Sequence, residues 1–228
     1  ELGRTVDEVF AEFEWEPIAA ASIGQVYKAT LRTGEPVIVK AQRPRVADLV
    51  ERDTTVLLRL AQTAENNTPL GAEYRVHELA SEFARSLAEE LDFRIEARNL
   101  AAVADTRVEG VAVPRAYGEY SSERVLVMER FDGTPLRHAL PELATRGIGQ
   151  RDLAERLLDY LLRQVMVDGV FHADPHPVNI LLLADGRLGM LDFGSVGRLD
   201  SSLRAAMQRL LAAVDSGDPL YLCDAVLE

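Results

Sequence analysis

The stretch that decides the fold is Phe171-His172-Ala173-Asp174-Pro175-His176-Pro177-Val178-Asn179, followed 13 residues later by Asp192-Phe193-Gly194. A His-x-Asp-x-x-x-x-Asn loop and a later Asp-Phe-Gly are the parts that phosphoryl transfer requires. Asp174 is the candidate catalytic residue, because it can orient the attacking hydroxyl or accept its proton. Asn179 and Asp192 are candidate metal ligands, because they offer the hard oxygen atoms that Mg²⁺ prefers. We expect His172 to be structural and to hold the loop against the metal-binding turn.

Two simpler interpretations compete with this one. The loop could be only a Pro-stiffened turn, and Asp-Phe-Gly only an Asx turn at the end of a strand. His172 and His176 with the nearby aspartate could also imitate a metal site, but no third His or Cys lies close in sequence. We therefore interpret His176 as a hydrogen-bonding residue of the loop, and we prefer the catalytic interpretation because the first half of the chain supplies complementary parts.

The complementary part is an Ala-rich stretch that has the layout Gly-x-Gly-x-x-Gly-x-Val of a phosphate-binding loop, with Ala at the first two glycine positions. Because Ala disfavours positive φ and keeps a Cβ, we expect a stiffer loop than one built from glycine. An Ala-rich helix start is the alternative. Lys40 follows Val26 of this stretch by fourteen residues, and the run Val37-Ile38-Val39-Lys40 places it at the end of a predicted strand. The candidate cofactor-binding residues here are Ala19, Ala20, Ala21, Ser22, Ile23, Gly24, Val26 and Lys40.

Lys40 needs an acidic partner to orient it, and the segment from Glu89 to Ala97 offers several. Asp92 and Glu96 are four apart on one helix face, a like-charged pair that costs about a few tenths of a kcal/mol unless a cation lies beside it. Glu90 and Arg94 form a favourable pair at the same spacing. We therefore favour Glu96 over Glu90 as the partner of Lys40.

Composition excludes several classes of protein. The 228 residues include 25 Lys+Arg and 37 Asp+Glu, for a net charge of −12, which argues against a nucleic-acid or anionic-membrane partner held by bulk charge. Only Lys28 and Lys40 are lysines, so 23 of the basic residues are arginines, and Lys28 is interpreted as a solvated edge residue. The single cysteine excludes a disulfide framework and fits a reducing compartment. No apolar run reaches the roughly 18–20 residues of a spanning helix. The start lacks a signal-peptide pattern and a Met, so we expect a piece of a longer chain.

Periodicity and turn signals predict an α+β fold of two lobes, 1–129 and 130–228, in which inserted helices accompany a small antiparallel sheet and the second lobe is mostly helical. The predicted helices cover 6–15, 46–64, 72–104, 136–144, 151–168 and 200–214, and the predicted strands cover 23–30, 36–41, 111–118 and 124–129. Two short strands flank 184–187, while 66–71 and 132–135 are expected to be a loop and a break. A stripe at a spacing of four is expected to face the core: Leu79, Phe83, Leu87, Leu91 and Ile95.

Together these motifs resemble the UbiB (aarF-domain) family of atypical protein-kinase-like proteins, from residue 1 to about residue 200. The resemblance rests on the Ala-rich loop, Val-Ile-Val-Lys-Ala-Gln-Arg-Pro, Glu-x-Asp-x-x-x-Glu-Ala, His-Ala-Asp-Pro-His-Pro-x-Asn and Leu-Asp-Phe-Gly. It implies a kinase-like fold, binding of ATP and Mg²⁺, and ATPase activity. It makes Lys40 the ATP-binding lysine, places Glu90 and Asp92 on the Glu-x-Asp motif, and makes Glu96 the partner of the lysine. Glu129, at the end of the strand before the lobe boundary, is included among the cofactor-binding candidates.

The resemblance also implies a role in isoprenoid-quinone or related lipid metabolism at a membrane. The partners would be a nucleotide, membrane lipid or quinone-biosynthesis enzymes, and the location cytoplasmic, with the membrane reached peripherally or through segments outside this chain. A small-molecule kinase of the aminoglycoside or choline type and a non-catalytic nucleotide sensor are the alternatives.

This chain departs from the family in two ways. The Lys-x-Gly-Gln segment of the family is absent. Val178 replaces the usual Gly, which would cost roughly 1–3 kcal/mol if the position needs positive φ.

Overall fold

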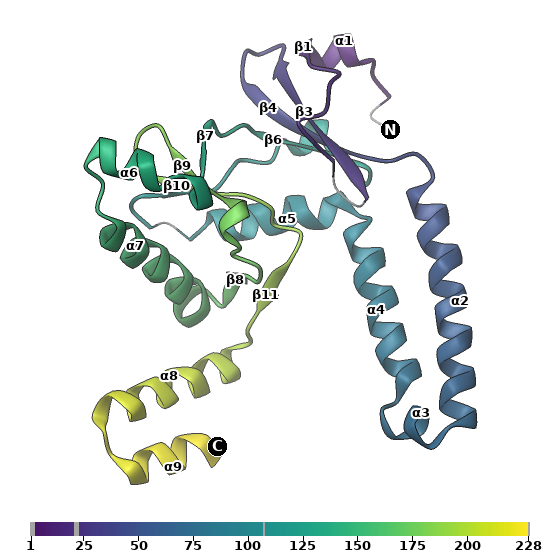
Figure 1. Ribbon diagram of the computed structural model, residues 1–228, viewed down its shortest axis with the longest axis vertical. Helices are drawn as coiled ribbons and strands as arrows, with labels where there is room; N and C mark the ends of the chain where they lie inside the picture. Colours follow the sequence, from purple (N-terminus) through teal and green to yellow (C-terminus); the bar gives the residue numbers. More distant parts are fainter. Residues whose placement is uncertain (1–2, 21–22, 107, 228) are drawn as a thin grey trace. The chain divides into compact units, whose positions relative to one another are not determined.

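The computed structural model describes residues 3–20, 23–106 and 108–227, which form two compact units (Figure 1). The first unit contains the described residues up to Ala97 together with Ala116–Arg130, and the second contains Arg98–Arg115 and the residues from Phe131 onward. The predicted lobes, 1–129 and 130–228, place 98–115 with the first lobe, whereas its contacts group this segment with the second unit. Among the described residues, no helix is both long and apolar enough to cross a membrane.

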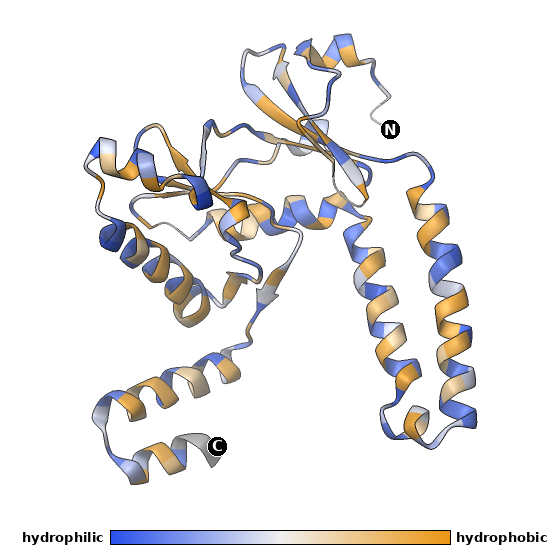
Figure 2. Ribbon diagram, viewed as in Figure 1, coloured by the Kyte–Doolittle hydropathy of each residue, from blue (hydrophilic) through white to orange (hydrophobic). Residues whose placement is uncertain are grey.

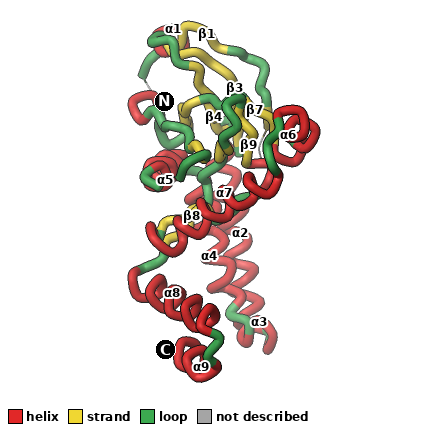
Figure 3. The backbone as a smooth tube through the Cα atoms, turned by 90° about the vertical axis from the view of Figure 1, so that its left-hand side faces the viewer, coloured by secondary structure: helices red, strands yellow, loops and turns green. Residues whose placement is uncertain are grey.

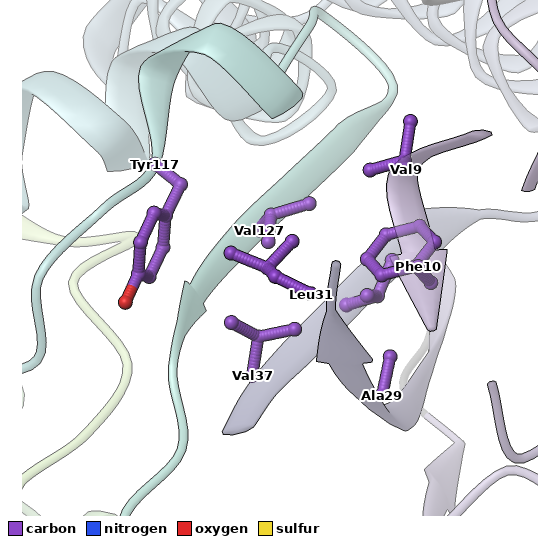
Figure 4. Close-up of a cluster of buried hydrophobic side chains, with 8 residues drawn as sticks. Val9, Phe10, Ala29, Leu31, Val37, Tyr117 and Val127 are labelled. Atoms are coloured by element: carbon purple, nitrogen blue, oxygen red, sulfur yellow. The ribbon is translucent and has the colours of Figure 1, made fainter. Parts of the chain in front are cut away.

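An antiparallel sheet forms the centre of the first unit, with the strand order β1-β3-β4-β6 and with β2 paired to β3. Its strands are β1 (Phe10–Phe13), β2 (Ala19–Ala20), β3 (Gly24–Leu31), β4 (Pro36–Gln42) and β6 (Val125–Glu129). The predicted hairpin of β3 and β4 is confirmed. Gly34 has φ 101° in its turn, a conformation that glycine adopts at little cost. Figure 4 shows the core of this unit, which includes Val9, Phe10, Ala29, Leu31, Val37, Tyr117 and Val127.

Helices α1 (Val6–Val9), α2 (Val46–Asn67), α3 (Pro69–Glu73), α4 (Val76–Glu90) and α5 (Phe93–Ala104) complete this part of the chain. Helices α2 and α4 lie side by side as an antiparallel hairpin with α3 at its tip (Figures 1 and 3). The predicted loop over 66–71 is wrong, because α2 continues to Asn67 and α3 begins at Pro69, with the Thr68 side chain accepting a hydrogen bond from Gly71 N. That bond caps α3.

The predicted helix over 6–15 is wrong after Val9. From Phe10 to Phe13 the chain is β1, which pairs with β3. The ring centroids of Phe10 and Phe13 are 5.4 Å apart, and those of Phe13 and Tyr27 are also 5.4 Å apart. Packing against a neighbouring strand has overridden the local helical preference.

The predicted helix over 72–104 is wrong as one element, because it is broken twice. Arg75 has φ 47°, in the left-handed region, between α3 and α4. Between α4 and α5, the Asp92 carboxylate accepts a hydrogen bond from Arg94 N at 2.9 Å and starts a new helix. The stripe expected to face the core is also wrong in part, since Leu79 and Phe83 are 57% and 55% exposed.

The second unit contains two small sheets. One has the order β5-β10-β9-β7 and the other pairs β11 with β8. The strands are β5 (Val111–Ala112), β7 (Gly133–Pro135), β8 (Val170–His172), β9 (Ile180–Leu183), β10 (Leu188–Met190) and β11 (Val196–Arg198). The two predicted strands that flank 184–187 are confirmed as β9 and β10. The strand predicted over 111–118 is reduced to β5, and the predicted break at 132–135 contains β7, so this unit has more strands than expected.

Besides the part of α5 from Arg98 onward, the second unit contains the helices α6 (Leu140–Arg146), α7 (Gln150–Arg163), α8 (Ser201–Ser216) and α9 (Pro219–Leu227). The predicted helix over 136–144 is instead a 3₁₀ turn, Leu136–His138, followed by α6. The predicted helix over 151–168 ends in a π-helical turn, Gln164–Asp168, directly before β8. Helix α8 matches the prediction over 200–214, whereas α9 was not predicted.

Candidate functional site

Lys40 lies near the end of β4, where its ammonium is held by Glu96 from the first turn of α5. Lys40 Nζ is 2.5 Å from Glu96 Oε1, and the two side chains are only 17% and 7% exposed. The structure therefore forms the ion pair that the sequence predicted, between residues 56 positions apart. Removing one partner of such a shielded pair takes a compensating charge away from the other, which is strongly destabilising.

The strand register places candidate nucleotide-binding residues beside Lys40. Val26 pairs with Lys40 on one side and with Ala19 on the other, so these residues share one face of the sheet. Ala20 pairs with Gln25. Ile23 O accepts a hydrogen bond from Arg43 N at 2.9 Å. Ala21 and Ser22 lie outside the described residues.

Gly24 is required by the sheet itself. A Cβ at this position would lie 2.7 Å from Ala41 O, a distance that a real side chain does not tolerate. The glycine of the Ala-rich motif therefore has a packing role in β3, in addition to any role toward a phosphate that its position in the motif predicts.

Asp92 contacts Arg94, whereas Glu96 contacts Lys40. Arg94 Nε lies 2.8 Å from Asp92 Oδ1, and a second Arg94 nitrogen lies 3.2 Å from Glu123. The hydrogen bond to Asp92 raises the pKa of Arg94 above its usual value. The predicted Glu90–Arg94 pair is thus replaced by contacts of Arg94 with Asp92 and Glu123, and Glu90 is an exposed residue at the end of α4.

Glu129, the last cofactor-binding candidate of the first unit, ends β6. It pairs with Val37 of β4, and Arg130 N donates to Pro36 O at 3.1 Å just beyond it. The register places Glu129 at the opposite end of β4 from Lys40, which pairs with Leu126.

In the second unit, His172 connects the loop that carries Asp174 to the Asp-Phe-Gly turn. Asp174 N donates to His172 Nδ1 at 3.2 Å, so Nδ1 is an acceptor and the ring proton is on Nε2. Nε2 then donates to Leu191 O, also at 3.2 Å. The imidazole is buried, and its centroid lies 5.0 Å from that of the fully buried Phe193 ring. This is the position that the predicted structural role of His172 requires.

Asn179 and Asp192 are brought together by the ladder of β9 and β10. Ile180 pairs with Met190, and one residue further out Leu191 N donates to Asn179 O at 2.7 Å. Asp192 follows directly, with its side chain exposed and with φ 58°, a left-handed conformation that Asp tolerates better than most residues. The two candidate metal ligands therefore lie on adjacent chain segments.

The remaining residues of the loop have local partners. His176 Nδ1 accepts a hydrogen bond from Val178 N at 3.3 Å, as expected of a loop residue. Val178 lies in a 3₁₀ turn and is not among the described residues with positive φ, so the strain considered for it does not arise. No group of three or more His, Cys, Asp or Glu residues that could hold a metal occurs in the described part of the chain.

Gln164 is a residue of this site that the sequence analysis missed. It is fully buried at the start of the π-helical turn, and its Oε1 accepts the N–H of His172 at 3.0 Å. Tyr160, one turn earlier, is also fully buried, and this burial raises the pKa of its phenol above the usual value. The available signal was a glutamine in the mostly apolar segment Leu161-Leu162-Arg163-Gln164-Val165-Met166-Val167.

A second missed residue fixes the Asp-Phe-Gly turn. Asn99, on α5, is buried and donates from Nδ2 to Phe193 O at 3.0 Å. Ala173 N donates to Ser195 O at 3.1 Å and ties the loop to the residue after the turn. The Asp-Phe-Gly turn is therefore fixed by a buried hydrogen bond from Asn99, and a backbone hydrogen bond ties it to the loop that carries Asp174.

Together, a lysine–glutamate pair in an antiparallel sheet and an Asp/Asn/Asp set on held loops define the class of atypical kinase-like proteins. Comparison with known protein families matches residues 1–222 to the ABC1 atypical kinase-like domain, and the chain belongs to this family. The resemblance to UbiB-type proteins is confirmed.

Individual relatives agree with this assignment. An uncharacterized protein of Synechocystis is 37% identical over 94% of this chain and 55% of its own length. An uncharacterized protein of Mycobacterium tuberculosis is 38% identical over 94% of this chain and 44% of its own length. The chloroplastic protein ACTIVITY OF BC1 COMPLEX KINASE 8 of Arabidopsis thaliana is 34% identical over the whole chain and 30% of its own length. The chain thus spans about half, or less, of the length of these relatives.

A solved structure confirms the predicted α+β, kinase-like fold. The complex of Rv3197 with erythromycin, from Mycobacterium tuberculosis, matches with a TM-score of 0.76 and 27% identity, over 98% of this chain and 56% of that one.

Proposed function

We propose that the chain binds ATP with Mg²⁺ and transfers the terminal phosphoryl group, either to water or to an acceptor. The observation that carries this proposal is the shielded Lys40–Glu96 pair, 2.5 Å apart and beside the Ala-rich strand. A lysine oriented by a glutamate is the arrangement with which kinases hold the α- and β-phosphates.

The choice of lysine at position 40 supports a phosphate ligand. This chain uses arginine for 23 of its 25 basic residues, yet it keeps a lysine at this position. A compact ammonium can enter between phosphate oxygens where the wider, planar guanidinium fits poorly. An ion pair with a purely structural role would be served as well, or better, by arginine.

The donor set in the second unit fits Mg²⁺. Asn179 and Asp192 offer an amide oxygen and a carboxylate oxygen from adjacent segments, and Mg²⁺ prefers such hard ligands together with phosphate and water oxygens. When bound, the ion neutralises charge on the phosphates. Asp174 remains for the attacking hydroxyl: it is exposed, and the His172 imidazole holds its backbone, so its carboxylate can orient the nucleophile and take its proton.

The wider role that we propose is support of isoprenoid-quinone or related lipid metabolism at a membrane. Membership of the ABC1 family and the Arabidopsis relatives named for activity of the bc1 complex support this role. The partners would be a nucleotide and a membrane lipid or quinone-biosynthesis enzyme. The location would be cytoplasmic, at the membrane through peripheral contact or through segments outside this chain.

The test is ATP hydrolysis and ATP binding in the wild type and in matched lysine variants, with and without anionic liposomes. We expect Lys40→Arg to lower kcat by about a hundredfold, the scale of losing one placed charge donor. Lys28→Arg is the control, since Lys28 lies in the neighbouring strand of the same hairpin and pairs with Ile38. It should leave kcat unchanged.

Asp192→Asn tests the metal side of the proposal. We expect this variant to lose the Mg²⁺ dependence of ATP binding, measured by calorimetry, as well as hydrolysis. Binding of ATP without any hydrolysis by the wild type would contradict the enzyme proposal and favour a nucleotide sensor. Phosphorylation of an added soluble alcohol or amine would favour a small-molecule kinase instead.

A further inference from the structure

Asn99 is a polar residue on the buried side of α5. It is 8% exposed, while Leu100 beside it and Val103 one turn later are fully buried. Figure 2 shows hydrophilic and hydrophobic positions mixed along this helix. Burying an amide costs free energy unless its hydrogen bonds are replaced, and asparagine is also a poor helix former. An apolar residue would serve the packing of α5 better at this position, so packing alone does not explain the amide.

The amide of Asn99 holds one particular peptide group of the Asp-Phe-Gly turn. Asn99 Nδ2 donates to Phe193 O at 3.0 Å, and Phe193 is fully buried. The same peptide group carries the N–H of Gly194, which donates to Asp192 Oδ1 at 3.3 Å. Because a trans peptide group is planar and its C=O and N–H point in opposite directions, a fixed carbonyl also fixes the direction of the N–H. Asn99 therefore sets the position of a donor to the Asp192 carboxylate.

The peptide group on the other side of Asp192 is held as well. His172 Nε2 donates to Leu191 O at 3.2 Å, and Leu191 directly precedes Asp192. Asp192 lies between these two held carbonyl groups with φ 58°. This left-handed conformation is unfavourable for residues other than glycine, and it persists where the surrounding structure imposes it. Two buried side chains, the His172 imidazole and the Asn99 amide, supply contacts that impose it here.

We propose that Asn99 is a positioning residue for the Asp192 carboxylate, and that it acts through the peptide group between Phe193 and Gly194. The inference rests on the proposed function, in which Asp192 is a ligand of Mg²⁺. Because Mg²⁺ demands nearly ideal octahedral geometry, a carboxylate that rotates away from its place loses affinity for the ion. Groups that orient a metal ligand without touching the metal change the affinity by about 10–100-fold when they are removed.

Helix α5 also carries the partner of Lys40. Glu96 lies three residues before Asn99, about one turn along the uninterrupted helix Phe93–Ala104. One helix therefore contacts both the lysine proposed to hold the phosphates and the turn proposed to hold the metal. Because the two contacts come from different side chains, their effects can be separated: Asn99 acts on the metal ligand, whereas Glu96 acts on the lysine. A substitution of Asn99 should therefore weaken metal binding and leave metal-free binding of the nucleotide unchanged.

The test is the binding of Mn²⁺, a paramagnetic substitute for Mg²⁺, to the protein with a non-hydrolysable ATP analogue, measured by electron paramagnetic resonance. Asn99→Leu keeps a similar volume but has no donor, and we expect it to raise the Kd for Mn²⁺ by at least about tenfold. The Kd for the analogue in the presence of EDTA should stay unchanged, which a general loss of structure would not allow. Asn99→Ala provides the same comparison where the larger leucine does not fit.

Val103→Ala is the control, because Val103 is fully buried on the same helix and has no polar group that could hold the turn. It should lower the urea midpoint of unfolding and leave the Kd for Mn²⁺ unchanged. Wild-type Mn²⁺ binding in the Asn99 variants, together with its loss in Asp192→Asn, would overturn the role of Asn99 and leave the metal site standing. Equal weakening by Val103→Ala would overturn that role as well. A wild type that binds no Mn²⁺ with the analogue would overturn the proposed metal site, and the role of Asn99 with it.

Discussion

Replacing Gln164 with leucine tests how the loop that carries Asp174 is held in place. Gln164 is fully buried, and its Oε1 is the acceptor for the backbone N–H of His172 at 3.0 Å. Leucine has a similar volume but no acceptor, so the variant leaves a buried N–H without a partner, at a cost of about 1–3 kcal/mol. Gln164 Nε2, which is buried without a hydrogen-bond partner in the described part of the chain, is removed in the same change. This removal offsets part of the cost.

We therefore expect Gln164→Leu to lower the free energy of unfolding by about 1–2 kcal/mol. Activity should fall further than stability explains. His172 positions Asp174 through its Nδ1 and the residue before Asp192 through its Nε2, so a shift of its backbone displaces both carboxylates. At a temperature where the variant is fully folded, we expect kcat for ATP hydrolysis to fall by about tenfold, with little change in KM, because misplacement affects the transition state more than binding.

Urea unfolding followed by far-UV circular dichroism gives the stability, and steady-state ATP hydrolysis gives kcat and KM. Gln208→Leu is the matched control, because Gln208 is exposed and donates to Met166 O at 2.6 Å in the same π-helical turn. It should change the free energy of unfolding by no more than about 0.5 kcal/mol and leave kcat unchanged. Equal effects of the two variants, or a wild-type kcat in folded Gln164→Leu, would refute the reasoning.

Three further predictions concern stability. Glu96→Gln should lower the free energy of unfolding by about 3 kcal/mol, because the shielded Lys40 loses its counter-charge; urea unfolding measures this. Gly133→Ala should cost about 1–3 kcal/mol, since its Cβ would lie 2.6 Å from a carbonyl of β9, whereas Gly118→Ala meets nothing within 4 Å and should cost less than about 1 kcal/mol. The Ser202 hydroxyl and two N–H groups at the start of α8 lower the pKa of Asp200. The folded state therefore favours the carboxylate, and this stability is present at neutral pH and is lost as the pH falls through the lowered pKa. Asp200→Asn should remove that pH-dependent part of the unfolding free energy.

Much of the candidate site could be predicted because its residues are fixed by short-range rules. Strands β3 and β4 pair across a short turn, and so do β9 and β10. The loop at Asp174 likewise has hydrogen-bond partners within a few residues of it. Lys40 and Glu96 are far apart in sequence, but the requirement that a shielded lysine have a carboxylate limited the choice to a few positions. The structure then shows that Asp92 takes Arg94 as its cation and leaves Glu96 to Lys40.

The parts that were missed depend on contacts that no local pattern contains. Phe10 and Phe13 have a helical spacing to Val6 and Val9, and only the presence of β3 beside them makes this segment a strand. In the sequence, Gln164 is simply a polar residue within a predicted helix. Its hydrogen-bond donor, the N–H of His172, reaches the Gln164 side chain only because the chain turns back after the π-helical turn. Sequence patterns describe local secondary-structure preferences, whereas the positions of these residues are set by tertiary contacts.

The stripe at Leu79 and Phe83 is a second case in which the local pattern did not predict the tertiary contacts. A spacing of four on a helix predicts that one face is apolar, and this was correct, but it does not specify what covers that face. Within the described residues of its unit, the stripe meets α2 along one side and remains exposed on the other. Leaving large apolar side chains in water costs about 25 cal/mol for each Å² that could be buried, so a face of this size favours association. The predicted core-facing stripe therefore fails at Leu79 and Phe83 because, among the described residues of this unit, α2 covers only one side of it.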